Sequence, residues 1–281
     1  MATIAHLSDV HFGRHDPAVV AALETCLIER RPELVVVSGD FTQRARIDQY
    51  EEACAFVDRL EAGGLPVLGV PGNHDVPLYD VVRRFVRPLS RYRRYIDEEL
   101  CPWFESERLA VLGINTARSL TIKDGRINRD QMRIIRDRFN AVPEAKTRIL
   151  VTHHPLFAMP IGEEEGLTKR VGRHEDALLA VADAGVHILL AGHFHRSYVR
   201  SARDMVENAG PALVIQAGTA TSTRLRADEV QSFNWIHAHR NDAIDLQVFG
   251  WDGLTFAGGS HARYNFEGDR WHAAVAEPVQ E

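Results

Sequence analysis

The sequence predicts an α/β fold in which two β-sheets pack face to face, with helices on the outside. Strand-like runs alternate with helical patterns over the first two thirds of the chain. The last third is richer in strands, and two alternating segments flank Arg240-Asn241-Asp242 as in a β-hairpin. With 45% hydrophobic and 26% charged residues among 281, the composition provides a large core.

We expect one domain over residues 1–270, because no Pro/Gly/Ser-rich linker interrupts the chain. Residues 271–281 are small and polar and are expected to form a flexible tail. The cysteines Cys26, Cys54 and Cys101 are widely spaced and form no Cys-x-x-Cys pair, which suits a reducing compartment. Because the chain has no apolar run of 18 residues and no secretory leader, we expect no membrane span and a cytoplasmic location.

The first predicted strand, Thr3–Ser8, leads directly to Asp9 and His11. In an extended segment, residues two apart point to the same side, so these two side chains can bind one ion together. Asp16 followed by Pro17 is typical of a helix N-cap with proline at the first helical position. A helix is therefore expected to start here.

The second predicted strand is the β-branched run Leu34–Val37, typical of a strand buried on both faces of a parallel sheet. It ends at Gly39-Asp40, and a helix is expected from about residue 47 to residue 60. A third strand over Pro66–Val70 leads to Gly72-Asn73-His74-Asp75. An amide and an imidazole thus follow a strand's carboxyl end, where open α/β sheets bind ligands.

The stretch from Leu78 to Leu100 is expected to be helical, with an interruption at Pro88. Its six arginines are Arg83, Arg84, Arg87, Arg91, Arg93 and Arg94. The apolar positions at helical spacing are Val82, Phe85, Val86 and Leu89. This stripe predicts an amphipathic helix whose arginines form the solvated face. The alternative is that one or two of the arginines grip a substrate phosphate.

The later part of the chain repeats the pattern of strand, then polar tip. Further strands are predicted over residues 109–114, 148–152, 187–191, 212–217, 233–238 and 244–251. Asn128-x-x-Gln131 is a capping box that opens a helix to about Phe139, and another helix is expected over residues 174–184. Two of these strands lead to His153-His154-Pro155 and to Gly192-His193-Phe194-His195.

The segment Leu156–Gly172 has no clear period and leaves the predicted site directly after His153. We interpret it as a candidate lid over the site. Its apolar residues Phe157, Met159 and Ile161 are expected either to contact a leaving group or to pack as ordinary loop residues.

Five predicted strand ends therefore carry side chains that bind metals. Together they offer three carboxylate or amide oxygens and four imidazoles, which suit Mn, Fe and Zn better than Ca or Mg. Seven ligands are too many for one ion but fit two ions if one carboxylate bridges them. Bridged ions about 3.5–4 Å apart serve in-line phosphoryl displacement. A similar spacing, His237-Ala238-His239, lies in the predicted hairpin and is interpreted as structural.

The motif set, in this order and over nearly the whole chain, resembles that of the calcineurin-like metallophosphoesterases. The closest resemblance is to the bacterial class III cyclic-nucleotide and glycerophosphodiester phosphodiesterase branch, which opens Asp-x-His and carries Asn-His-Asp. The resemblance implies a four-layer αββα sandwich of two mixed β-sheets flanked by helices. It also implies a metal site at the carboxyl ends of the strands.

The ligands that the resemblance implies are Asp9, His11, Asp40, Asn73, His153, His193 and His195. Asp9, His11 and His195 would hold one ion, Asp40 would bridge, and the other three would hold the second ion. His154 rivals His153, but the family pattern His-x-Pro favours His153. A hydroxide between the two ions would be the nucleophile.

The resemblance gives His74 and Asp75 catalytic roles rather than metal-binding ones. His74 would donate a hydrogen bond to the phosphoryl oxygens or protonate the leaving oxygen. Asp75 would orient His74, and the alternative for Asp75 is a helix N-cap.

The implied activity is that of a dinuclear-metal phosphohydrolase that cleaves small phosphodiesters, either cyclic nucleotides or glycerophosphodiesters. Phe41-Thr42-Gln43-Arg44 replaces the Asp-Arg-Gly extension of Ser/Thr protein phosphatases, which disfavours phosphoprotein chemistry. Alternatives are a nuclease or phosphomonoesterase of the same fold, or a non-catalytic scaffold. The net charge of −6 disfavours nucleic acid as a partner, whereas retention of every ligand and of His74 disfavours the scaffold. Relatives are often dimers or larger, so a homo-oligomer is an expectation of the family.

Overall fold

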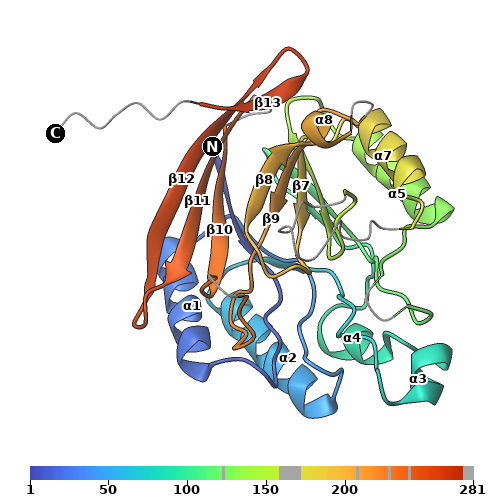
Figure 1. The fold of residues 1–281 in the computed structure, drawn as a ribbon, viewed down its shortest axis with the longest axis vertical. Helices are drawn as coiled ribbons and strands as arrows, with labels where there is room; N and C mark the ends of the chain where they lie inside the picture. The colour runs from blue at the N-terminus through green and yellow to red at the C-terminus, as the bar shows by residue number, and fades with distance from the viewer. Residues whose placement is uncertain (122–123, 158–171, 207–208, 227–228, 240–241, 275–281) are drawn as a thin grey trace.

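The protein folds into two mixed β-sheets, described here in a computed structural model that covers residues 1–121, 124–157, 172–206, 209–226, 229–239 and 242–274. The seven-stranded sheet has the order β13-β12-β11-β10-β1-β2-β3, and the six-stranded sheet has the order β4-β5-β6-β7-β9-β8 (Figure 1). The predicted fold class, two mixed sheets flanked by helices, is confirmed.

The strands of the first sheet are β1 (Ala2–Leu7), β2 (Leu34–Val37), β3 (Val67–Gly69), β10 (Ser232–His239), β11 (Ala243–Trp251), β12 (Phe256–Glu267) and β13 (Arg270–Ala273). Those of the second sheet are β4 (Trp103–Glu105), β5 (Leu109–Ile114), β6 (Thr147–Thr152), β7 (Ile188–Ala191), β8 (Tyr198–Ser201) and β9 (Leu213–Gln216). The helices are α1 (Pro17–Arg30), α2 (Ile47–Ala62), α3 (Val81–Val86), α4 (Ser90–Tyr95), α5 (Arg129–Asn140), α7 (His174–Asp183) and α8 (Ala202–Met205).

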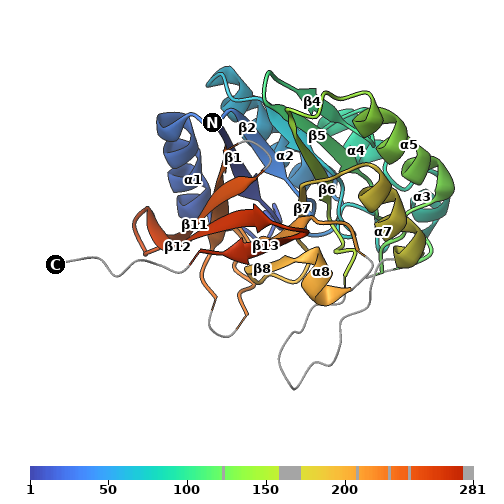
Figure 2. The same ribbon diagram turned by 90° about the horizontal axis from the view of Figure 1, so that it is seen from above.

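Alternation along the strands builds the four layers. In β2, Val35 and Val37 face a cluster with α1 and α2, whereas Val36 faces the second sheet. Val151 of β6 and Leu190 of β7 meet Val36 in the core between the sheets. Figures 1 and 2 show α1 and α2 on one side of the paired sheets, and α5 and α7 on the other. Strands buried on both faces are held rigidly, which fixes where their ends lie.

The predicted helix starts are confirmed by their hydrogen bonds. The Asp16 carboxylate accepts from the amide of Ala18 at 2.9 Å, and Pro17 is the first residue of α1. Asn128 and Gln131 form the predicted reciprocal capping box at the start of α5.

Four strands, β4, β8, β12 and β13, were not predicted. Trp271 of β13 is only 3% exposed, and its indole N–H donates to the Pro211 carbonyl at 2.8 Å. The folded chain therefore extends past the boundary expected at residue 270, because β13 pairs with β12 as the edge strand of the seven-stranded sheet. Residues 275–281 of the expected tail lie outside the described residues.

The arginine-rich stretch forms two short helices, α3 and α4, on either side of Pro88 as predicted, but α3 is turned the other way. Val82, Phe85 and Val86 are 75%, 55% and 69% exposed. Arg84, in contrast, is only 7% exposed. The prediction that the apolar stripe faces the core and the arginines face solvent is therefore wrong for α3.

Arg84 turns inward because three backbone carbonyls near α3 need hydrogen-bond donors. The Arg84 guanidinium donates to the carbonyls of Pro77, Ser119 and Thr121 at 3.0, 2.8 and 2.6 Å. One side chain thus ties α3 to two loops, and a six-residue helix cannot bury both this guanidinium and its apolar face.

Most of the candidate lid, residues 158–171, lies outside the described residues. Phe157, at its start, is 2% exposed and packs in the cluster beneath α5 and α7, so this residue follows the ordinary packing alternative. Among the described residues, no helix has the length and apolar character needed to cross a membrane.

We predict that Arg84→Leu lowers the free energy of unfolding by about 1–3 kcal/mol, because it leaves buried carbonyls without donors. Arg83→Leu is the matched control: Arg83 pairs with Asp80 at 3.0 Å on the surface, and its loss should cost at most about 1 kcal/mol. Urea unfolding followed by circular dichroism measures both. Equal destabilisation by the two variants would contradict the anchoring role of Arg84.

Candidate metal centre

The ends of β1, β2, β3, β6 and β7 converge and bring all seven predicted ligands together. These strands are parallel neighbours within their sheets, and the two sheets face each other across one core. Their carboxyl ends therefore meet at a single edge of the sandwich. The seven side chains form two adjoining groups that share Asp40.

The first group consists of Asp9, His11 and His195. Nε2 of His11 lies 3.2 Å from Nε2 of His195, and Asp9 Oδ1 lies 3.6 and 3.2 Å from these two nitrogens. Asp9 and His11 are fully buried. Asp9 and His11 thus lie close together as expected, but through left-handed backbone rather than an extended segment, and His195 comes to them from the turn after β7.

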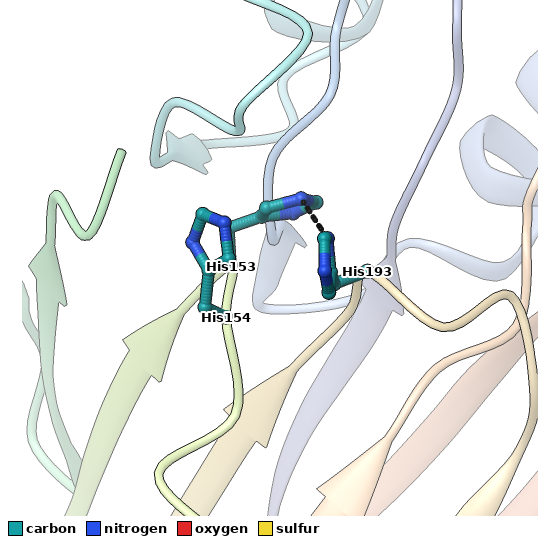
Figure 3. A group of neighbouring side chains, drawn as sticks. All are labelled: His153, His154 and His193. Carbon is teal, nitrogen blue, oxygen red and sulfur yellow. Dashed lines mark hydrogen bonds between the residues drawn. The ribbon is translucent and has the colours of Figure 1, made fainter. Parts of the chain in front are cut away.

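The second group consists of Asn73, His153 and His193. Asn73 Oδ1 lies 3.1 Å from His153 Nε2 and 3.0 Å from His193 Nδ1. The two imidazole nitrogens are 3.3 Å apart, and a dashed line joins them in Figure 3. One amide oxygen and two ring nitrogens therefore point to a common centre.

Asp40 lies between the two groups. Its Oδ2 is 3.7 Å from Nε2 of His11 and 3.4 Å from Nε2 of His153. Burial by itself would raise the pKa of Asp40, but His153 and His74 beside it hold that pKa well below its usual range. Asp40 therefore stays ionised and draws positive charge toward both groups.

The donor set fits metal ions. Two atoms that each lie about 2.1 Å from one ion are roughly 3–3.4 Å apart, and most separations within the two groups fall in or near this range. Asp9 Oδ1 is buried and accepts no hydrogen bond from the described residues, so it retains a lone pair for a cation. Oxygen and imidazole donors in this mixture suit Mn, Fe and Zn.

Hydrogen bonds outside the two groups fix which ring nitrogens face inward. Nδ1 of His153 donates to the Ser38 carbonyl at 2.7 Å. Nδ1 of His195 donates to the Arg224 carbonyl at 3.2 Å. In both rings the lone pair is thereby left on Nε2, the atom that faces the other donors.

The backbone is strained at the same positions. Five of the seven predicted ligands have φ between 51° and 83°, and they are Asp9, His11, Asp40, His193 and His195. A non-glycine residue in this left-handed region costs about 1–2 kcal/mol. Such a concentration at one site indicates that the strand ends are bent to aim these side chains inward.

His154, the rival for His153, lies behind His153 and beside His193. Its ring centroid is 4.6 Å from that of His193, and its Nδ1 is 2.8 Å from the Thr116 hydroxyl (Figure 3). Nε2 of His154 is buried and has no hydrogen-bond partner among the described residues. Of the two rivals, His153 and His154, it is His153 that lies near Asn73 and Asp40. This favours His153 as the ligand.

The structure corrects both interpretations of Asp75. Its carboxylate accepts from the amides of Phe41 and Thr42 at 3.1 and 2.9 Å and from that of Gly72 at 2.9 Å. Among the described residues its carboxylate makes no hydrogen bond to the His74 ring, and it caps no helix, since the next helix begins at residue 81. Asp75 instead fastens the turn after β3 to the turn after β2.

His74 has a different orienting partner. Its Nδ1 donates to the Gln43 carbonyl at 2.8 Å, and its backbone N–H donates to Asp40 Oδ1 at 2.8 Å. Nε2 of His74 is left for other contacts. The ring lies 4.9 Å from that of His11, edge to face, at the margin of the first group.

A cavity of about 200 Å³ opens beside His74. Its lining residues are Gln43, Arg44, Asn73, His74, Val76, Leu78, Arg84 and Arg224. Sequence reasoning missed three of these as site residues, Gln43, Arg44 and Arg224. The position of Gln43-Arg44, two residues beyond Gly39-Asp40, was a usable signal, whereas Arg224 lies in a loop with no motif of its own.

The chain is similar to known phosphoesterases. The family model of the calcineurin-like phosphoesterases matches residues 2–197. A probable cyclic nucleotide phosphodiesterase from Synechococcus sp. is 24% identical over 210 residues, which are 70% of this chain and 75% of that protein. The DNA double-strand break repair protein Mre11 from Nanoarchaeum equitans is 29% identical over 84 residues, which are 26% of this chain and 23% of that protein.

Solved structures share the fold. The purple acid phosphatase PPD1 from yellow lupin matches with a TM-score of 0.70 and 14% identity, over 92% of this chain and 52% of the lupin protein. This chain thus spans about half the length of that enzyme. A dimetal phosphatase from Danio rerio matches with a TM-score of 0.64 and 14% identity, over 92% of this chain and 98% of that protein.

The turn after β3 packs closely against the turn after β2 at Gly72. A Cβ at this position would collide with Oδ1 and the backbone nitrogen of Asp40. We expect Gly72→Ala to displace Asp40, to destabilise the protein by about 1–3 kcal/mol, and to lower its metal content.

Gly250→Ala is the control, because a Cβ there would have only Cγ2 of the exposed Val230 within 4 Å, at 3.3 Å, and would not approach Asp40. Thermal unfolding and metal analysis by mass spectrometry compare the two variants. Normal stability and metal content in Gly72→Ala would show that Asp40 does not need this close approach.

Proposed function

Because the chain belongs to the calcineurin-like phosphoesterase family, we propose that it is a metal-dependent phosphodiesterase that acts on small phosphodiesters. The observation that carries this proposal is the position of Asp40 between two groups of donors, with His74 at their margin. An arrangement with one shared carboxylate is suited to in-line displacement at phosphorus.

Members of this family use divalent metal ions, and the donor atoms here fit two of them. Asp9, His11 and His195 would hold one ion, Asn73, His153 and His193 would hold the other, and Asp40 would contact both. When bound, such ions polarise phosphoryl oxygens and lower the pKa of water. Mn, Fe and Zn match the donors, and we make no choice among them.

His74 is the residue that we propose to act on the reacting atoms. Its Nδ1 proton is held by the Gln43 carbonyl, and its ring lines the cavity, so Nε2 can hold a proton for the leaving oxygen or for a phosphoryl oxygen. Asp75 is a positioning residue. Through its bonds to Phe41 and Thr42 it fixes the turn that carries Asn73 and His74.

Arginines around the cavity, and a tyrosine beside one of them, bear on which kind of phosphodiester the site accepts. Arg84 lines it, but its guanidinium already donates to three backbone carbonyls. Arg44 and Arg224 also line it, and the Arg44 guanidinium lies 5.8 Å from the centre of the Tyr79 ring. An arginine beside an exposed tyrosine is a surface on which nucleobases stack. Together with the Synechococcus relative, this favours cyclic nucleotides over glycerophosphodiesters.

The alternatives have less support. The match to Mre11 extends over only 26% of this chain, which leaves the nuclease alternative without an observation of its own. A non-catalytic scaffold does not need strained backbone at five metal-ligand positions. The cytoplasmic location, the homo-oligomeric state and the absence of a nucleic-acid partner stay predictions.

We predict that His74→Ala and Asp40→Asn fail in different ways. His74→Ala should keep its metal content and fold and lose mainly kcat, by about 10²–10⁴. Asp40→Asn removes the shared charge, so it should lose metal before it loses its fold. Metal content per chain, measured beside kcat for both variants, distinguishes the two roles. Demetallation of His74→Ala would make His74 a ligand and contradict the role proposed for it.

The proposed reaction is tested by a substrate panel under one metal condition. We expect kcat/KM to be higher for a nitrophenyl diester than for a nitrophenyl monoester, because a diester carries one negative charge and needs fewer fixed cations around its oxygens. The panel should include 2′,3′- and 3′,5′-cyclic nucleotides. A clear monoester preference would overturn the phosphodiesterase proposal, and turnover of diesters without cyclic nucleotides would point to glycerophosphodiesters.

A further inference from the structure

A second, larger cavity of about 720 Å³ lies between the α3–α4 segment and the loop after β5. Its charged lining residues are Arg87, Arg93, Arg94, Arg118 and Glu98. The cavity therefore presents four guanidinium groups and one carboxylate. The sequence singled out three of these arginines, and the proposed function uses none of them.

Most of this positive charge has no counter-charge. Glu98 lies 3.9 Å from Arg93, at the limit of an ion pair. Arg87 and Arg94 have no carboxylate within ion-pair distance in the described parts of the chain. Arg118 donates to the Arg126 carbonyl and to the Gln131 side-chain oxygen, both at 2.7 Å, and both acceptors are neutral.

Arg118 is also partly withdrawn from water. Burial lowers the pKa of its guanidinium, and the nearby Arg126 lowers it further. A guanidinium stays protonated even so, so the free energy of this charge must be offset by an anion or by solvent. The neutral acceptors hold the Arg118 fork in one place, which orients its remaining donors.

We propose that this cavity binds a phosphate-bearing anion at a site separate from the metal centre. Arginine forks match phosphate oxygens in pairs, and several forks around one cavity favour a group with three free oxygens over a planar carboxylate. The walls between the arginines are formed by Leu89, Leu100 and Ala117, which lower the effective dielectric and strengthen each charge pair.

The two cavities are separated by one wall. Val76 lines both of them, whereas Asn73 and His74 line only the smaller one. The Arg84 side chain, fixed by its three carbonyls, completes the separation between the turn after β3 and the loop at Ser119. An anion in the larger cavity would thus contact the back of the catalytic turn without reaching its metal-ligand atoms.

Exposed apolar side chains lie beside the larger cavity. Val86 lines it and is 69% exposed, and nearby Val82, Phe85 and Leu120 are 75%, 55% and 83% exposed. The backbone carbonyls of Ser119 and Thr121, bound by Arg84, place Leu120 beside α3. The phosphate can therefore come from a free phosphate compound or from the head of a phospholipid whose chains lie along α3, and binding experiments distinguish these sources.

The test is calorimetric titration of the metal-loaded protein with inorganic pyrophosphate and, separately, with dihexanoyl phosphatidic acid below its micellar concentration. The cavity variant is Arg87→Ala/Arg94→Ala, which removes two exposed side chains. The control is Arg129→Ala/Arg133→Ala, which removes the same charge from the exposed face of α5. Wild type and control should bind one molecule more per chain than the cavity variant, or bind it at least about tenfold more tightly.

A single-residue variant keeps the test valid if the double variant is unstable. Glu98→Gln removes the only carboxylate of the lining and should tighten binding of the same probe. Tighter binding of dihexanoyl phosphatidic acid than of pyrophosphate would identify a lipid as the source of the phosphate, and the reverse would identify a free phosphate compound. Equal stoichiometry and affinity in wild type, cavity variant and Glu98→Gln for both probes would overturn the proposal.

Discussion

The rest of this structure depends on two buried carboxylates. Asp9 and Asp40 are 0% and 1% exposed, and an ionised carboxylate removed from water must be matched by positive charge or by donors. Backbone and hydroxyl donors satisfy only part of each: Ser8 and the amide of His193 bind Asp9, and the amide of His74 binds Asp40. The remaining oxygens, Asp9 Oδ1 and Asp40 Oδ2, face imidazoles that come from three different strand ends. A cation shared by oxygen and nitrogen donors satisfies both kinds of atom at once.

Bringing these carboxylates and imidazoles together requires strained backbone at the strand ends, and the surrounding fold stabilises that backbone. Five predicted ligands have left-handed backbone at the ends of their strands, a conformation that persists only where the surroundings fix it. The double-sheet core fixes the strand ends from one side. From the other side, the hydroxyls of Thr219 and Thr221 donate to the carbonyls of Asp9 and Val10 at 2.6 and 2.5 Å. Asp75 does the same for the turns after β2 and β3.

The fold class, and the convergence of the five strand ends, could be predicted because both follow from short-range patterns in the sequence. Strand periodicity and the residues directly after each strand are local, and parallel strands bring their ends together. The errors concern contacts between distant segments. The sequence around Arg84 does not indicate that its guanidinium binds the carbonyls of residues 119 and 121. The sequence pattern therefore predicts that this helix turns its arginines to solvent. Likewise, two of the three backbone partners of Asp75, Phe41 and Thr42, lie more than 30 residues before it, and a local motif cannot specify them.

The turn from Asn73 to Val76 links the separate parts of this molecule. Asn73 and His74 face the donors of the metal centre, Asp75 is bonded to the neighbouring turn, and Val76 lines the arginine cavity behind. Burial, followed by the nearby charge of Asp40, raises the pKa of Asp75 to about 6. The carboxylate is nonetheless held by three backbone amides, so the turn has little freedom to move independently of Asp40. Val76 lines both cavities and Asn73 and His74 line the smaller one, so this fixed turn is the part of the chain that borders both.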